Sequence, residues 1–95
     1  MNQKLILPLL AELAKREAYL QVGDSILVQP AIDGMRVENP ISIPPFDHVQ
    51  INDALRWLAR QDYISTGGYP IDSASIGILF SRITPAGSRL MSQAA

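Results

Sequence analysis

The distribution of proline places the strongest constraint on how this 95-residue chain folds. Four of its seven prolines lie between residues 24 and 45; they are Pro30, Pro40, Pro44 and Pro45. Because proline lacks a backbone N–H and breaks helices, we expect no regular helix in this stretch. The chain is short enough to form only one domain, residues 1–95, with a helix before the proline-rich stretch and a different pattern after it.

The segment before the prolines predicts a helix from about residue 4 to residue 20. Its apolar residues recur at the three- and four-residue spacings of one buried helix face. They are Leu5, Leu9, Leu10, Leu13 and Ala14, with Leu20 as a further candidate. Proline is tolerated only near a helix start, so we expect the regular helix to begin at Leu7, with Pro8 as its first residue, and to end at Gly23.

Composition excludes several classes of protein. The chain has no cysteine, which excludes a disulfide framework and a thiolate metal site and suits a cytoplasmic protein. No apolar run approaches the ~18 residues of a membrane span. The apolar start faintly resembles a signal peptide, but Glu12 interrupts it, so we expect a first core helix. A formal net charge of −1 counts against DNA binding, because free-standing DNA-binding modules are usually basic.

Between the helices, two short segments have strand character. Residues 25–29 (SILVQ) predict one strand and residues 35–38 (MRVE) another, with the turn sequence Asp33-Gly34 between them. Pro30 would interrupt a central ladder, so such a hairpin is short or lies at an edge of a sheet.

The clearest element is a helix from Asp47 to about Gln61. Its apolar residues form a buried stripe, Ile51, Ala54, Leu55 and Leu58. Asp47 is expected to cap the helix N-terminus. After the helix, residues 63–66 and 76–81 have strand patterns on either side of a polar, glycine-containing loop. A last helix is expected to begin at Thr84-Pro85, with threonine as the cap and proline at the first helical position.

Two segments resemble the winged-helix family of regulators. Residues 51–64 (INDALRWLARQDYI) look like a recognition helix that ends at a turn and runs into the first wing strand. Residues 83–91 (ITPAGSRLM) are similar to the leucine-threonine-proline-x-glycine entry into the closing helix of many of these proteins. The resemblance covers roughly half of the chain. It implies an α+β fold with an N-terminal helix, an irregular or β segment, a recognition-like helix, a two-stranded wing and a C-terminal helix.

The chain also departs from this family in two places. A helix-turn-helix protein has a second helix directly before its recognition helix, whereas residues 39–46 (NPISIPPF) allow no more than a short turn from Phe46 to Val49. The expected wing loop, residues 67–75, contains no lysine or arginine.

Four polar residues follow one another at four-residue steps on the recognition-like helix, and we expect them to share one exposed face. They are His48, Asn52, Arg56 and Arg60. Such a face fits a major groove, where arginine reads guanine and asparagine reads adenine. The alternative is an ordinary solvated helix face, since Asp53 and Asp62 dilute its charge.

Trp57 and Tyr69 are candidates for a contact with a partner protein. Trp57 lies off the predicted buried stripe, and an exposed tryptophan beside arginines is typical of interface anchors. The alternative is that Trp57 packs under the wing or against the first helix. Tyr69, Ile71, Ile76 and Ile78 would, if exposed, make the wing an apolar edge that pairs with another subunit or a partner.

No pattern in the chain indicates catalysis, a metal or a cofactor. His48 is the only histidine and has no second strong ligand at a fitting spacing. Ser42 and Ser65 have no evident base nearby. We therefore expect a small non-enzymatic DNA-associated regulator that acts as a homodimer. The alternative is a protein-interaction adaptor with the same fold and no DNA binding, of the kind found among bacterial or phage accessory proteins.

Overall fold

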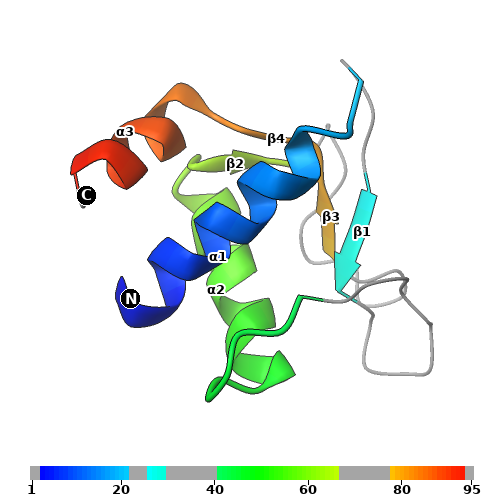
Figure 1. The fold of residues 1–95 in the computed structure, drawn as a ribbon, viewed down its shortest axis with the longest axis vertical. Helices are drawn as coiled ribbons and strands as arrows, with labels where there is room; N and C mark the ends of the chain where they lie inside the picture. Colours follow the sequence, from blue (N-terminus) through cyan, green and yellow to red (C-terminus); the bar gives the residue numbers. More distant parts are fainter. Residues whose placement is uncertain (1–2, 22–25, 30–40, 67–77, 94–95) are drawn as a thin grey trace.

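The computed structural model describes residues 3–21, 26–29, 41–66 and 78–93. Within these ranges the chain forms an α+β fold of three helices and four short strands, which confirms the predicted class (Figure 1). In chain order the elements are α1 (Gln3–Glu17), β1 (Ile26–Gln29), α2 (His48–Arg60), β2 (Ile64–Ser65), β3 (Ile78–Phe80), β4 (Arg82–Ile83) and α3 (Pro85–Gln93).

Helix α1 is the expected core helix and starts near residue 4, as predicted, but it does not begin at Leu7 and it ends earlier than predicted. It begins at Gln3, with Pro8 inside it, and ends at Glu17 rather than at Gly23. Pro8 lies in the second turn of α1 and has no N–H to donate to the carbonyl four residues earlier. The helix stops in tight turns, in which the N–H of Leu20 donates to the carbonyl of Glu17 at 2.9 Å.

The strands pair differently from the prediction. The expected hairpin joined residues 63–66 to residues 76–81, but β2 pairs with β4, in the register Ile64 opposite Ile83. Strand β3 instead pairs antiparallel with β1, with Phe80 opposite Ile26. The chain changes partner at Ser81, whose N–H donates to the carbonyl of Ser65 at 2.8 Å. Residues 78–83 therefore pair with β1, which precedes α2, and with β2, which follows it.

The proline-rich middle is only partly described. The strand predicted at residues 25–29 is confirmed as β1, and residues 41–46 form no helix, as expected. Ile41 and Ile43 are buried there, and the N–H of Phe46 donates to the carbonyl of Ile43 in a turn. The predicted strand at 35–38, its Asp33-Gly34 turn and the wing loop at 67–75 lie outside the described residues.

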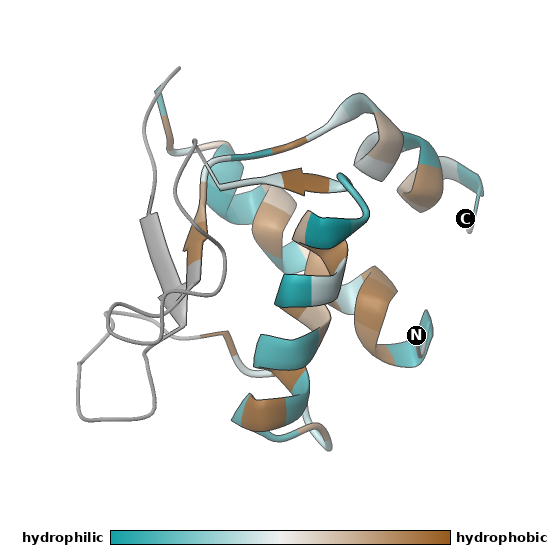
Figure 2. Ribbon diagram, turned by 180° about the vertical axis from the view of Figure 1, so that it is seen from behind, coloured by the Kyte–Doolittle hydropathy of each residue, from teal (hydrophilic) through white to brown (hydrophobic). Residues whose placement is uncertain are grey.

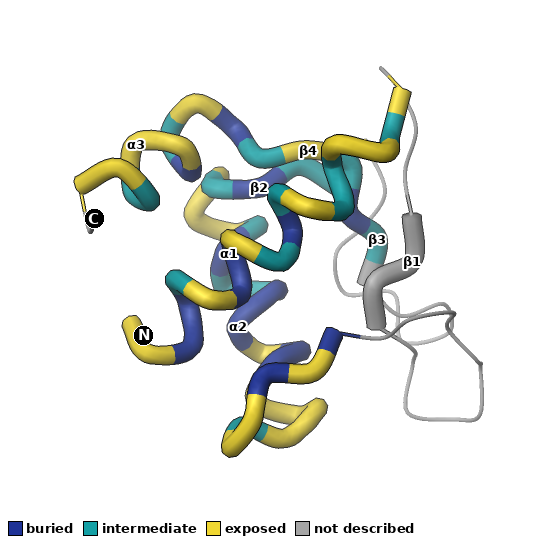
Figure 3. Tube along the Cα trace, viewed as in Figure 1, coloured by how far each residue is buried: buried dark blue, intermediate teal, exposed yellow. Residues whose placement is uncertain are grey.

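The core lies where α1 crosses α2, with the strand pairs along one side and α3 at the other end (Figure 1). The dark blue segments of α1 and α2 in Figure 3 face each other across this core. The largest side chains that fill it, each exposed by no more than 2%, are Leu9, Leu10, Leu13, Ile51, Leu55, Leu58, Ile64 and Phe80. Leu5 and Ile6 extend the core to the first turn of α1, so the apolar start of the chain is a core helix, as expected.

Candidate functional site on helix α2

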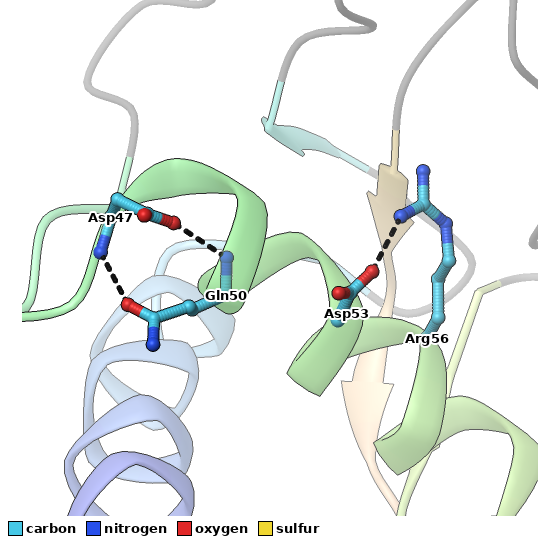
Figure 4. Close-up of polar contacts among 4 residues, drawn as sticks. All are labelled: Asp47, Gln50, Asp53 and Arg56. Atoms are coloured by element: carbon cyan, nitrogen blue, oxygen red, sulfur yellow. Dashed lines mark hydrogen bonds and ion pairs between the residues drawn. The ribbon is translucent and has the colours of Figure 1, made fainter.

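The N-terminus of α2 is held by a capping box (Figure 4). The carboxylate of Asp47 accepts a hydrogen bond from the N–H of Gln50 at 2.9 Å, and the Gln50 side chain accepts one from the N–H of Asp47 at 3.0 Å. The predicted cap is confirmed, with Gln50 as a reciprocal partner that the prediction did not include. The predicted stripe is confirmed as well, since Ile51, Ala54, Leu55 and Leu58 are all buried.

The C-terminus of α2 ends in a Schellman motif. Gln61 is the C-cap and Asp62 follows it with a φ of 63°, in the left-handed region. The N–H of Asp62 donates to the carbonyl of Ala59 at 3.1 Å, and the N–H of Tyr63 donates to the carbonyl of Leu58 at 2.9 Å. This reversal sends the chain directly from the helix into β2.

Trp57 packs against Tyr63, which follows the Schellman motif at the end of α2. Its ring lies 5.7 Å from the ring of Tyr63, at an interplanar angle of 41°, and both residues are half-buried against the core. An apolar contact across the last turn often accompanies a Schellman motif. Trp57 therefore packs on Tyr63 and the core, whereas the expected alternative was packing under the wing or against the first helix. Its contact with a partner protein stays a prediction. The other partner candidate, Tyr69, lies outside the described residues.

The four residues predicted to share an exposed face do not all do so. His48 and Arg60 are exposed and Arg56 is half-buried, but Asn52 is only 4% exposed, so the expectation is wrong for Asn52. Each four-residue step advances about 40° around a helix, and this drift places Asn52 at the edge of the buried stripe. Its Oδ1 atom is buried and accepts no hydrogen bond from the described residues.

Two other residues take the place of Asn52 on the exposed side of α2. Val49 is 49% exposed and the side chain of Asp53 is 67% exposed. The Asp53 carboxylate lies 3.4 Å from Nη1 of Arg56, whose side chain is 30% exposed, in an ion pair between residues three apart (Figure 4). The sequence spacing was sufficient to suggest this pair. The exposed face of α2, defined here as Val49, Asp53, Arg56 and Arg60, is therefore mixed in charge.

Figure 2 shows this side of the molecule, with α2 in front of α1. Hydrophilic and apolar residues alternate along the part of α2 seen there. Helix α1 packs on the opposite, buried side of α2, so it does not cover the exposed face.

Thr84 fixes α3 to the end of α2. Its hydroxyl donates to the carbonyl of Asp62 at 2.6 Å and accepts a hydrogen bond from the N–H of Gly87 at 3.2 Å. Its own N–H donates to the carbonyl of Tyr63 at 3.1 Å. The predicted helix start is confirmed, with Thr84 as the cap and Pro85 as the first helical residue. The exit of α2 and the entry of α3 are thus one hydrogen-bonded unit.

The described residues bring no metal-binding cluster together. In residues 3–21, 41–66 and 78–93 no three His, Cys, Asp or Glu side chains lie close enough to hold a metal ion. Over the same part of the chain, no helix has the length and apolar character needed to cross a membrane.

Comparison with known proteins finds no matching family model, no matching curated protein and no matching solved structure. Function is therefore inferred from the geometry of α2 and the elements that hold it.

Proposed function

We propose that this chain is a winged-helix-like, non-enzymatic domain that associates with duplex DNA through α2. The order of elements supports the fold, because a helix runs directly into a strand and a returning segment leads into a closing helix. The pairing of β1 with β3 supports it further, since it joins the strand between the first two helices to the returning segment. Residues 41–46, directly before α2, form no helix, whereas a helix-turn-helix protein has its second helix at this position.

The observation that carries the DNA-binding proposal is the placement of Arg56 and Arg60 on one side of a rigid helix, with Arg60 exposed and Arg56 half-buried. Helix α2 is capped at both ends and has α1 packed on its other side. A single α-helix fits the major groove of B-DNA, where arginine side chains contact guanine or the flanking phosphates. His48, exposed in the first turn, extends the polar surface toward the helix N-terminus. Asn52 has no place in this contact, because it is buried.

The experiment is fluorescence anisotropy of a pool of labelled duplexes of mixed sequence, at low and at moderate salt. We expect binding that weakens steeply with salt, because arginines that meet phosphates release counterions. The double variant Arg56→Ala/Arg60→Ala should bind more weakly and depend less on salt. Lys15→Ala/Arg16→Ala on α1 is the control, since it removes the same charge from another helix. Absence of binding at the lowest salt overturns the proposal.

The DNA-binding form is proposed to be a homodimer. Two symmetry-related copies place two recognition helices on successive half-sites, which raises both affinity and specificity. Sedimentation equilibrium tests this directly. A mass of one chain at every concentration, with and without DNA, contradicts the dimer but leaves the DNA contact itself untouched.

A second candidate function is a protein-interaction adaptor that uses the same face of α2. The exposed apolar side chain of Val49 favours it, because a 49% exposed valine two turns before Trp57 provides apolar area beside an aromatic anchor. If the domain is such an adaptor, the wild-type protein should self-associate or bind a partner protein. The variants Val49→Ser and Trp57→Ala should then lose this association. Monomeric behaviour of all three proteins in sedimentation rules out self-association through this face.

A further inference from the structure

The ion pair between Asp53 and Arg56 lies within the surface that the DNA proposal uses. The Asp53 carboxylate is 3.4 Å from Nη1 of Arg56. Asp53 is the more exposed partner, with 67% of its side chain accessible, against 30% for Arg56. A ligand that approaches Arg56 from solvent therefore meets the carboxylate as well as the guanidinium.

The sequence positions of Asp53, Arg56 and Arg60 also place the carboxylate on the side of α2 that carries both arginines. Asp53 is three residues before Arg56 and seven before Arg60, so all three lie along the same side of α2. Residues seven apart complete about two helical turns. One carboxylate thus faces the same solvent region as both arginines of the exposed face.

A DNA phosphate and the Asp53 carboxylate compete for the same guanidinium. Both are anions, and both accept N–H donors of arginine in the same planar geometry. A phosphate that binds Arg56 shares the guanidinium with the Asp53 carboxylate or displaces it from Nη1. In either case the nearby carboxylate repels the phosphate. An exposed ion pair of this kind is weak in water, so it does not block Arg56 but lowers its affinity for any anion.

We propose that Asp53 is a negative determinant of DNA binding, which limits phosphate binding by Arg56 and so suppresses sequence-independent association. This inference rests on the proposed function. It agrees with the overall charge of −1, since a domain with few phosphate contacts must obtain its affinity from base contacts or a partner subunit. Specificity obtained by weakening the wrong complexes is a common device.

The test compares Asp53→Asn with wild type and with Glu12→Gln on mixed-sequence duplex DNA. Glu12 is a matched control, because it forms an ion pair with Lys15 at 3.5 Å, also three residues apart, on α1. Both substitutions remove one negative charge and break one exposed helical ion pair. Only Asp53→Asn removes a carboxylate from beside an arginine on the exposed face of α2.

We expect Asp53→Asn to bind mixed-sequence DNA about tenfold more tightly than wild type near 50 mM salt and about threefold more tightly near 200 mM, the gain from one additional phosphate contact. The slope of log affinity against log salt should steepen by about one unit. Glu12→Gln should stay within about twofold of wild type at both salt concentrations, because long-range charge effects are screened beyond roughly 10 Å.

Three other results would contradict either the role of Asp53 or the proposed function. Equal affinity of Asp53→Asn and wild type, with both bound to DNA, overturns the role of Asp53 and leaves the proposed function standing. An equal gain for Glu12→Gln and Asp53→Asn reduces the effect to net charge and also overturns it. Absence of DNA binding by all three proteins at the lowest salt overturns the proposed function itself.

Discussion

The carboxylate of Glu17 accepts a hydrogen bond from the backbone N–H of Ile83 at 3.0 Å. The contact joins the last residue of α1 to β4, 66 residues further along the chain. Strand β4 pairs with β2 on its other side, so Glu17 satisfies a donor that the two-stranded sheet leaves unpaired. This hydrogen bond fixes the end of α1 against the returning strand.

Replacement of Glu17 by alanine should lower the free energy of unfolding by roughly 1–3 kcal/mol, because it leaves the part-buried N–H of Ile83 without its acceptor. Glu17→Gln keeps an acceptor oxygen and should lose less. Urea unfolding measures both. Glu12→Ala, which breaks only the exposed pair with Lys15, should cost no more than about 0.5 kcal/mol. Equal losses for Glu17→Ala and Glu12→Ala would show that the long-range contact contributes nothing.

Local signals in the sequence were sufficient to predict α2 and the start of α3. The cap at Asp47, the apolar stripe from Ile51 to Leu58 and the Thr84-Pro85 helix entry each depend on residues within a few positions of one another. The α+β class follows from the order of such segments. These features are encoded locally, which is why a single sequence reveals them.

The strand partners and the burial of Asn52 depend on contacts between distant segments. Strands β2 and β3 both have an apolar pattern, and no property of either excludes their pairing. The pairing of β3 with β1 joins segments far apart along the chain, and a local pattern does not specify such a pairing. Asn52 is polar and lies at the edge of the buried stripe, where a small difference in helix orientation decides between exposure and burial.

Gly87 should not tolerate a side chain. A Cβ at this position would overlap the carbonyl oxygen of Tyr63 and lie 2.7 Å from Cγ2 of Ile83. Because one obstacle is backbone, α3 must shift, and Gly87→Ala should cost about 1–3 kcal/mol despite the better helix propensity of alanine. Thermal unfolding measures the loss. Ser88→Ala, at the adjacent exposed position, is the control, and equal stability of the two variants would contradict the close packing of α3.

Asp62 offers an opportunity to stabilise the domain. Its φ of 63° lies in the left-handed region that glycine adopts at no steric cost. Asp62→Gly should therefore raise the free energy of unfolding by roughly 0.5–1 kcal/mol, and Asp62→Ala should lower it by a similar amount. The hydrogen bond from Thr84 is unaffected in both, since it uses the backbone carbonyl. A Gly variant no more stable than the Ala variant would mean that α2 does not end in this conformation.

Substitutions of the buried Asn52 should change the stability of the domain without changing its affinity for DNA. Its Oδ1 is buried and accepts no hydrogen bond from the described residues, so Asn52→Leu, of similar shape, should raise the free energy of unfolding by about 1 kcal/mol. Asn52→Asp should do the opposite, because it places a charge at the same buried position. Both changes are measured by urea unfolding.

The DNA affinity of Asn52→Leu should stay within about twofold of wild type, since a side chain 4% exposed cannot reach a base edge. Arg60→Ala, which removes an exposed cation from the same helix, should weaken binding under identical conditions. If Asn52→Leu loses DNA binding but keeps its stability, Asn52 does contact DNA. Helix α2 must then rotate when the protein binds DNA, so that Asn52 becomes exposed.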